Sequence, residues 1–296
     1  MAKMIDGKWE AQWQPTDGDG NGSFVRKASS FRDMIAPERP EAGRYHLFVA
    51  WTCPWAHRTL LARALKGLNE LIPVHFANEL GETSWRFEDP SESPHGDQYL
   101  YELYLRADPK YTGRVTVPVL WDEQAQRIVN NESAEILAML DTLPSDAPPL
   151  RPAHLLEEIG AWSDRLYDAL NNGVYRAGFA STQDAYDEAV VGVFEVLDQL
   201  EAHLQGREWL VGDQLTEADI RLFVTTFRFD AAYVPIFRCT LKRLSDYPNL
   251  HAHLKRFYAL PGVAETCNLE AMRRGYASIR AVNPTGIVPI GPRTLL

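Results

Sequence analysis

The sequence predicts two domains, an α/β domain in the first half of the chain and an all-α domain in the second half. A β-forming run at residues 45–50 precedes a helical pattern, and a second β-forming run follows at residues 73–77. Residues 142–153 hold four prolines and form the most linker-like stretch of the chain. Beyond this stretch, apolar residues recur at helical spacing and no convincing strand pair follows.

These patterns set the domain boundaries that we expect. An N-terminal arm covers residues 1–40, and the α/β domain covers residues 41–145. The all-helical domain covers residues 154–275, with an extended tail over residues 276–296. The second domain includes helical patterns at 155–170, 183–204, 217–229 and 250–260, and a capping box begins the third of them at Thr216.

The composition excludes several classes of partner. The chain has 296 residues, of which 45% are hydrophobic, and a formal net charge of −10. This charge argues against nucleic acid or an anionic membrane as the main partner. No apolar run approaches the roughly 20 residues of a membrane span, and the N-terminus lacks the apolar core of a signal peptide. The three cysteines, Cys53, Cys239 and Cys267, do not form a disulfide framework, so we expect a cytoplasmic protein.

The N-terminal arm is polar and rich in glycine, so we expect it to be mostly irregular. Its aromatic residues, Trp9, Trp13 and Phe31, are expected to pin it to the body of the protein. Residues 17–21, Asp-Gly-Asp-Gly-Asn, faintly resemble a calcium loop. The bidentate glutamate and the flanking helices of such a loop are missing, so no metal site is expected.

Cys53 is the centre of the predicted function. It follows the first β-forming run, and Pro54 fits the first position of the helix that comes next. Cys53 is therefore expected at the helix N-cap, where unpaired N–H groups and the helix dipole favour a thiolate, the nucleophilic form of cysteine. The alternative is a small buried cysteine that only packs.

The segments that follow shape the surroundings of Cys53. The second β-forming run completes a βαβ unit, and residues 79–113 are longer than a simple connection needs. They could shape a site or form a solvated surface excursion. Residues 115–121 and 126–130 predict a β-hairpin, within which Pro118 is anomalous. A proline at the start of the strand with a cis bond would resolve the conflict. The next helix is expected to begin near Ser133, and its N-terminus could bind an anion.

Taken together, these motifs resemble a glutathione transferase over residues 44–275. The finer features are similar to the glutathionyl-hydroquinone reductases, or Xi-class glutathione transferases. The matching stretches run nearly the whole length of the chain and comprise Cys53-Pro-Trp-Ala, residues 113–122, Asn131-Glu-Ser, residues 171–175 and Asn283-Pro-Thr-Gly. The resemblance implies a thioredoxin-like α/β domain followed by an all-α glutathione-transferase domain.

The resemblance also implies a set of glutathione contacts. Val117 offers its backbone N–H and C=O to the cysteinyl part of glutathione, like an added strand. Glu132 takes the ammonium and Ser133 the carboxylate of the γ-glutamyl end, while Trp85 and Arg114 approach the peptide from the other side. Each residue has a structural alternative: Arg114 as a surface charge, for example, or Glu132 as an ordinary acid in a first helical turn.

The reaction implied is the glutathione-dependent reduction of glutathionyl-hydroquinones to hydroquinones. Cys53 would form a mixed disulfide with glutathione, which a second glutathione resolves, because the motif has no second cysteine at its fourth position. Tyr175 and Tyr276 would serve the departing ring as hydroxyl donors. Glutathione is the cosubstrate, no metal is implied, and the family is typically dimeric.

Other functions stay open on the sequence alone. A conjugating glutathione transferase would need Ser or Tyr to stabilise free glutathione thiolate, whereas a cysteine traps a mixed disulfide. A general glutathione-dependent thiol transferase would share the Cys53 chemistry. A non-catalytic scaffold is a third class, since a fold does not fix a function.

Overall fold

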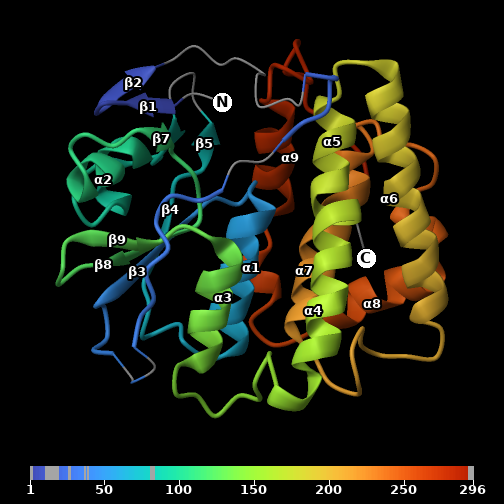
Figure 1. Cartoon of the computed structure of the whole chain (residues 1–296), viewed down its shortest axis with the longest axis horizontal. Helices are drawn as coiled ribbons and strands as arrows, with labels where there is room; N and C mark the ends of the chain where they lie inside the picture. Colours follow the sequence, from blue (N-terminus) through green and yellow to red (C-terminus); the bar gives the residue numbers. More distant parts are fainter. Residues whose placement is uncertain are drawn as a thin grey trace. The chain divides into compact units, whose positions relative to one another are not determined.

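The chain divides into two compact units (Figure 1). Unit 1 comprises Met1–Thr16 and Lys27–Pro148, and unit 2 comprises Asp17–Arg26 and Pro149–Leu296. The computed structural model describes residues 3–10, 20–25, 28–36, 38, 40–80 and 84–292. The N-terminal arm is thus shared between the two units, and most of it belongs to unit 1.

A four-stranded sheet forms the centre of unit 1, in the order β4-β3-β8-β9. Strand β3 (Tyr45–Val49) pairs in parallel with β4 (Val74–Phe76), and α1 (Pro54–Leu65) joins them, which confirms the predicted βαβ unit. Strands β8 (Val119–Asp122) and β9 (Arg127–Asn130) form the predicted antiparallel hairpin. The Val117–Pro118 bond is cis and lies directly before β8, as expected.

Two helices of unit 1 begin at residues with capping side chains. Cys53 is the N-cap of α1, Pro54 is its first residue, and the buried face of the helix includes Leu60 and Leu61. Gly67 ends the helix in the left-handed conformation, with φ +65°. Helix α3 (Ser133–Thr142) packs against α1 and has Glu132 as its N-cap.

The arm is more regular than its sequence indicates. Strands β1 (Lys3–Ile5) and β2 (Lys8–Glu10) form a hairpin that pairs with β7 (Gly113–Arg114), so the expectation of an irregular arm was wrong for these residues. Strands of two or three residues are too short to show an alternating pattern. A Cβ at Gly7, which turns the hairpin at φ +73°, would lie 2.1 Å from the Pro109 carbonyl oxygen.

Two of the three aromatic residues expected to pin the arm, Trp9 and Phe31, pack against other rings of unit 1. The Trp9 ring stacks on Tyr101 with a centroid distance of 5.3 Å, and the Phe31 ring contacts Tyr104 and Tyr111. Trp13 and the first three residues of the calcium-like run, 17–19, lie outside the described residues. Within the described part of the chain, no group of three His, Cys, Asp or Glu side chains is arranged to hold a metal ion.

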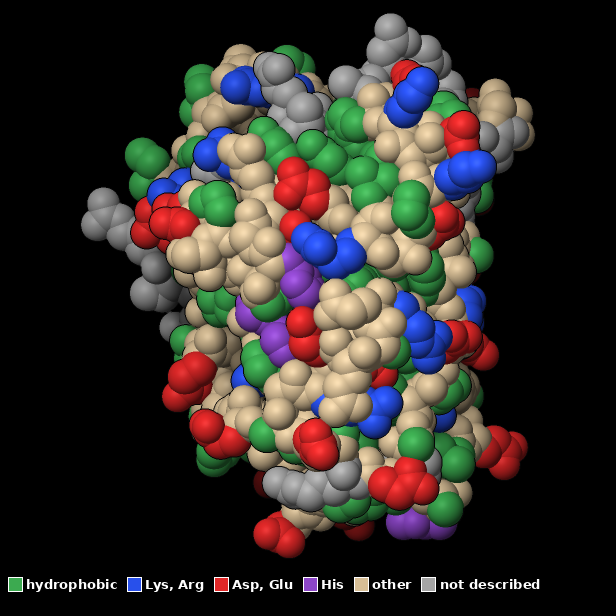
Figure 2. All heavy atoms as spheres, turned by 90° about the vertical axis from the view of Figure 1, so that its left-hand side faces the viewer, with side chains coloured by type: hydrophobic (Ala, Val, Ile, Leu, Met, Phe, Trp, Pro, Cys, Tyr) green, Lys and Arg blue, Asp and Glu red, His purple; other side chains and the backbone are tan. Residues whose placement is uncertain are grey.

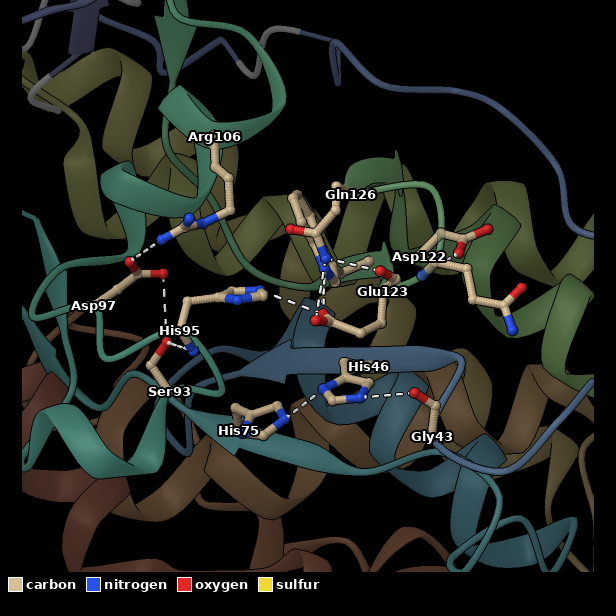
Figure 3. A network of polar contacts seen from close by, with 12 residues as sticks. Gly43, His46, His75, Ser93, His95, Asp97, Arg106, Asp122, Glu123 and Gln126 are labelled. Carbon is tan, nitrogen blue, oxygen red and sulfur yellow. Dashed lines mark hydrogen bonds and ion pairs between the residues drawn. The ribbon is translucent and has the colours of Figure 1, made fainter.

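The segment between β4 and β7 carries short elements of its own. These are β5 (Glu79–Leu80), β6 (Trp85–Arg86), a 3-10 turn at Pro90–Glu92 and α2 (Leu100–Ala107). A polar network ties this segment together and to the sheet (Figure 3). Its contacts include Arg106 Nη2 to Asp97 Oδ1 at 2.8 Å, His95 Nε2 to Glu123 Oε2 at 3.4 Å, and His75 Nδ1 to the Glu92 carbonyl oxygen at 2.8 Å. None of the predicted site residues belongs to these three contacts.

The surface drawn in Figure 2 has no dominant sign of charge. Acidic and basic side chains are interspersed over it, and histidine side chains gather near its middle. This face therefore carries no basic stripe of the kind that binds nucleic acid.

Unit 2 is helical. Its α-helices are α4 (Leu156–Arg165), α5 (Gly173–Phe179), α6 (Gln183–His203), α7 (Glu217–Arg228), α8 (Pro248–Tyr258) and α9 (Leu269–Ala277). Residues 149–292 contain no strand, as predicted, although α5 and α9 were not anticipated as separate helices. The expected start of the extended tail at residue 276 falls inside α9, because this helix continues to Ala277. No described helix is both long and apolar enough to cross a bilayer.

The start of α7 is held by two polar clusters. The predicted capping box is present, with Asp219 Oδ2 accepting from the Thr216 backbone N–H at 2.9 Å. Glu217 is fully buried and forms ion pairs with Arg151 and Arg221. Burial raises the pKa of Glu217, but the two guanidinium groups outweigh it and leave the carboxyl pKa below its ordinary value.

We predict that Glu217→Gln lowers the free energy of unfolding by about 3 kcal/mol at pH 7, because it leaves two arginines without their shared carboxylate. The carboxyl pKa is lower in the folded state, so this stabilisation is present above the ordinary value of about 4.5 and is lost as the pH falls through the folded value. Urea unfolding at pH 7 and at acidic pH measures both effects.

The difference between wild type and Glu217→Gln should therefore shrink in acid. Glu270→Gln is the matched control, since the Glu270–Arg274 pair is exposed and should contribute well under about 1 kcal/mol. A loss of stability that is the same at both pH values would contradict this account of Glu217.

Candidate active site

Cys53 occupies the position that favours a thiolate. Its backbone is extended, with φ −78° and ψ 116°, and its Sγ accepts a hydrogen bond from the Ala56 N–H at 3.5 Å. The sulfur therefore faces the positive end of α1, where unpaired N–H groups stabilise negative charge. The predicted N-cap role of Cys53 is confirmed.

The Cys53 sulfur also meets the segment before β8. Its Sγ lies 3.5 Å from the Val117 carbonyl oxygen, to which the thiol donates a hydrogen bond. Val117 and Cys53 are 64 residues apart in the chain. The structure thus brings together the predicted nucleophile and the residue predicted to pair with the glutathione backbone.

Glu132 and Ser133 lie together at the N-terminus of α3. Glu132 Oε1 accepts from the Ala134 N–H at 3.3 Å and from Ser133 Oγ at 3.5 Å. Its other oxygen, Oε2, accepts from Ser29 Oγ of the arm at 2.9 Å. The arm is thus in contact with a residue predicted to bind glutathione, which the sequence alone did not indicate.

The other two residues predicted to bind glutathione lie on neighbouring segments of unit 1. Arg114 ends β7, three residues before Val117, and its carbonyl oxygen accepts from the Tyr111 hydroxyl at 2.9 Å. Trp85 lies in β6, and its side chain is half-buried. The roles of both side chains toward glutathione stay predictions.

The two predicted hydroxyl donors meet in unit 2. The Tyr175 and Tyr276 hydroxyl oxygens are 2.8 Å apart. Tyr233 extends the chain of hydroxyls, since its oxygen lies 3.1 Å from that of Tyr276. The Phe237 ring packs against all three tyrosines, with centroid distances of 5.2 to 5.4 Å.

Tyr233 was missed by sequence reasoning. It lies in a π-helical segment, Phe229–Tyr233, after the end of α7. A signal existed, because Phe229, Tyr233 and Phe237 recur every four residues, but such a stripe also predicts ordinary core packing. Gly178 makes room for this cluster, since a Cβ there would lie 2.4 Å from the Phe237 ring.

Burial favours the neutral form of two of these phenols. It raises the pKa of Tyr233 and of Tyr276 well above the ordinary value of 10. The Tyr276 hydroxyl oxygen thus lies within hydrogen-bond distance of the other two, so the three phenols form one connected set. Neutral phenols are hydrogen-bond donors, so this set can donate to a bound group.

The remaining cysteines differ sharply from Cys53. Cys239 and Cys267 both lie in unit 2 and neither forms a disulfide. Burial raises the pKa of each thiol to about 12. Unit 1 contains a single cysteine, so it has no internal thiol to resolve a disulfide on Cys53.

Two family models match the chain. The model of the glutathione S-transferase N-terminal domain matches residues 52–143, and that of the glutathione S-transferase C-terminal domain matches residues 183–256. The first match contains Cys53 and the residues around it, and the second lies within unit 2.

Relatives match almost the full length of the chain. It is 50% identical to glutathionyl-hydroquinone reductase PcpF of Sphingobium chlorophenolicum, over 99% of this chain and 96% of the relative. It is 47% identical to glutathionyl-hydroquinone reductase YqjG of Escherichia coli, over 99% of this chain and 95% of the relative. Among solved structures, the glutathione-bound form of YqjG matches with a TM-score of 0.88 at 43% identity, over 99% of this chain and 96% of that one. A Xi glutathione transferase from Phanerochaete chrysosporium matches with a TM-score of 0.89 at 46% identity, over 94% of this chain and 95% of that one.

We predict that Cys53 has a thiol pKa below the roughly 8.5 of a free cysteine, because its sulfur faces the N-terminus of α1. Its rate of alkylation by iodoacetamide should therefore reach a plateau near neutral pH. Peptide mass spectrometry over a pH series measures this rate, and Cys239 and Cys267 should stay unlabelled in the folded protein. A midpoint at or above the free value for Cys53 would refute the N-cap argument.

Proposed function

The chain belongs to the glutathione S-transferase family, in the Xi class of glutathionyl-hydroquinone reductases, and on this basis we propose that it reduces glutathionyl-hydroquinones to hydroquinones with glutathione. The observation that carries the proposal is the placement of Cys53. It is the single cysteine of unit 1, it caps α1, and its sulfur touches the Val117 carbonyl. A lone thiolate at such a position can accept glutathione but needs an external thiol to release it.

Glutathione binding is proposed to use the segments around Cys53. Val117 pairs with the cysteinyl backbone, Glu132 takes the ammonium, and Ser133 takes the γ-glutamyl carboxylate at the N-terminus of α3. Arg114 supplies a fixed positive charge for a carboxylate of the peptide, and Trp85 contributes apolar contact. This arrangement would leave the glutathionyl sulfur beside Cys53.

In the first step, the Cys53 thiolate attacks the sulfur of the glutathionyl group. A disulfide bond forms between Cys53 and glutathione, and the bond between sulfur and the ring carbon breaks. The electron pair of that bond stays on the ring carbon, which takes up a proton, so the ring is reduced by two electrons. The phenols of Tyr175, Tyr276 and Tyr233 are proposed to supply this proton.

In the second step, the thiolate of a second glutathione attacks the mixed disulfide on Cys53. Glutathione disulfide leaves and the Cys53 thiolate is restored. The net reaction consumes one glutathionyl-hydroquinone and one glutathione, and it yields one hydroquinone and one glutathione disulfide. Phenols that stay neutral at physiological pH can be reprotonated from solvent between turnovers.

A conjugating activity is less well supported. Conjugation needs a hydroxyl that donates to the glutathione thiolate, whereas the group beside Val117 is itself a thiol. A general thiol transferase would need Cys53 but not the phenol chain of unit 2. The family resemblance also leads us to propose a cytoplasmic homodimer, which analytical ultracentrifugation can test.

We predict that Cys53→Ser abolishes reduction of glutathionyl-hydroquinones, because serine cannot form the mixed disulfide. Wild-type protein incubated with glutathione disulfide should gain the mass of one glutathione on Cys53, whereas the variant should gain none. Cys239→Ser is the control and should keep wild-type turnover. Retention of full activity by Cys53→Ser would place the nucleophile elsewhere.

We predict a different defect for Tyr276→Phe. Removing the middle hydroxyl of the phenol chain should lower kcat for glutathionyl-hydroquinone by about 100-fold or more, as expected for the loss of a general acid. The same variant should still accept glutathione from glutathione disulfide, because that step releases no ring. Tyr167→Phe, at an exposed tyrosine of the same unit, is the control. An equal loss in both reactions would show that Tyr276 does not act on the ring.

A further inference from the structure

The Tyr104 hydroxyl joins two segments of unit 1. Tyr104 lies on α2 and is completely buried. Its hydroxyl donates to the Thr116 carbonyl oxygen at 2.8 Å and accepts from the Thr116 backbone N–H at 3.2 Å. It also accepts from Asn131 Nδ2 at 3.1 Å. A tyrosine hydroxyl has one proton and two lone pairs, so these three contacts use its full bonding capacity.

Thr116 is in a stretch that the sheet does not pair. Residues 115–118 lie between β7 and β8 and belong to neither strand. A buried backbone N–H or C=O without a partner would be costly, and Tyr104 supplies a partner to both groups of Thr116. The Tyr104 side chain thus supplies the hydrogen bonds that a neighbouring strand would otherwise give to Thr116. The next residue, Val117, is thereby held against Cys53.

The second segment that Tyr104 contacts is the start of α3, where Asn131 is held by the arm. Asn131 Oδ1 accepts from the Phe31 N–H at 3.0 Å, and its own N–H donates to the Phe31 carbonyl at 3.1 Å. These bonds orient the amide so that Nδ2 points to Tyr104. The next residue, Glu132, is the N-cap of α3.

The helix that carries Tyr104 is anchored on its other side. Arg106 of α2 reaches Asp97, which also accepts from Ser93 Oγ at 3.3 Å (Figure 3). The Tyr104 ring packs against Phe31 and Tyr111, with centroid distances of 5.8 and 5.0 Å. Tyr104 is thus fixed between Thr116 and Asn131, which directly precede Val117 and Glu132.

From this geometry we infer that Tyr104 is a positioning residue, which sets the distance between the two halves of the glutathione site. The inference rests on the proposed function, in which Val117 binds the cysteinyl part of glutathione and Glu132 binds its γ-glutamyl end. Both halves must hold the same tripeptide at once, so a change in their spacing weakens binding. Tyr104 itself has no bonding capacity left for the substrate, so it acts only through its neighbours.

The first test is Tyr104→Phe, with reduced glutathione binding measured by calorimetry. We expect the Kd for glutathione and its KM to rise about tenfold, with kcat at saturating glutathione within twofold of wild type. Tyr247→Phe is the matched control, because it also removes a buried tyrosine hydroxyl, which donates to Asp198 at 2.9 Å in unit 2. Tyr247→Phe should lower the thermal stability about as much as Tyr104→Phe does, and it should keep the wild-type Kd for glutathione.

The second test removes the Asn131 side chain, which donates to the Tyr104 hydroxyl. Asn131→Ala should raise the Kd as well, and the double variant should lose less than the two single effects combined, because both break one shared contact. Absence of glutathione binding by the wild type would overturn the proposed function together with this role. Binding by the wild type with an unchanged Kd in Tyr104→Phe and Asn131→Ala would overturn the positioning role alone.

Discussion

The arrangement of unit 1 depends on the unpaired N–H groups at the start of two helices. Cys53 caps α1 and Glu132 caps α3, each with a side chain that accepts from the backbone N–H of the first turn. Both caps are groups that carry, or can carry, negative charge, which the positive end of a helix stabilises. The βαβ unit and the hairpin with cis Pro118 bring the first of these helix ends against Val117. The proposed nucleophile thus owes its position to the backbone architecture around it.

Features encoded within a short stretch of chain could be predicted from the sequence. The N-cap role of Cys53 follows from a strand, a proline and a helical pattern in direct succession. The cis bond before Pro118 follows from a proline where a ladder N–H would be needed. The pairing of the Tyr175 and Tyr276 hydroxyls was not predicted from spacing, but the resemblance gave both residues one role.

Features that depend on contacts between distant segments could not be predicted. The hairpin of β1 and β2 pairs with β7 more than 100 residues later, and its strands are too short for a periodic signal. Tyr233 belongs to an aromatic stripe that predicts core packing equally well. Tyr104 lies in residues 79–113, which the sequence left open as a site-shaping segment or a surface excursion, and the partners of its hydroxyl are 12 and 27 residues away in the chain. In each case the missing information is which partner completes a hydrogen bond.

The two units provide opposite electrostatic environments, and the proposed reaction requires both at one pH. In unit 1 the end of α1 favours loss of the Cys53 proton. In unit 2 burial raises the pKa of Tyr233 and Tyr276 and so favours retention of theirs. Placed at the helix N-terminus, a phenol would be biased toward its anion and would hold its proton less firmly, while a thiol buried like Cys239 is held at a pKa of about 12 and is not a thiolate at neutral pH. The helix end therefore favours the thiolate form of Cys53 and the aromatic core favours the protonated form of Tyr233 and Tyr276, so each proposed role lies in the environment that supports it.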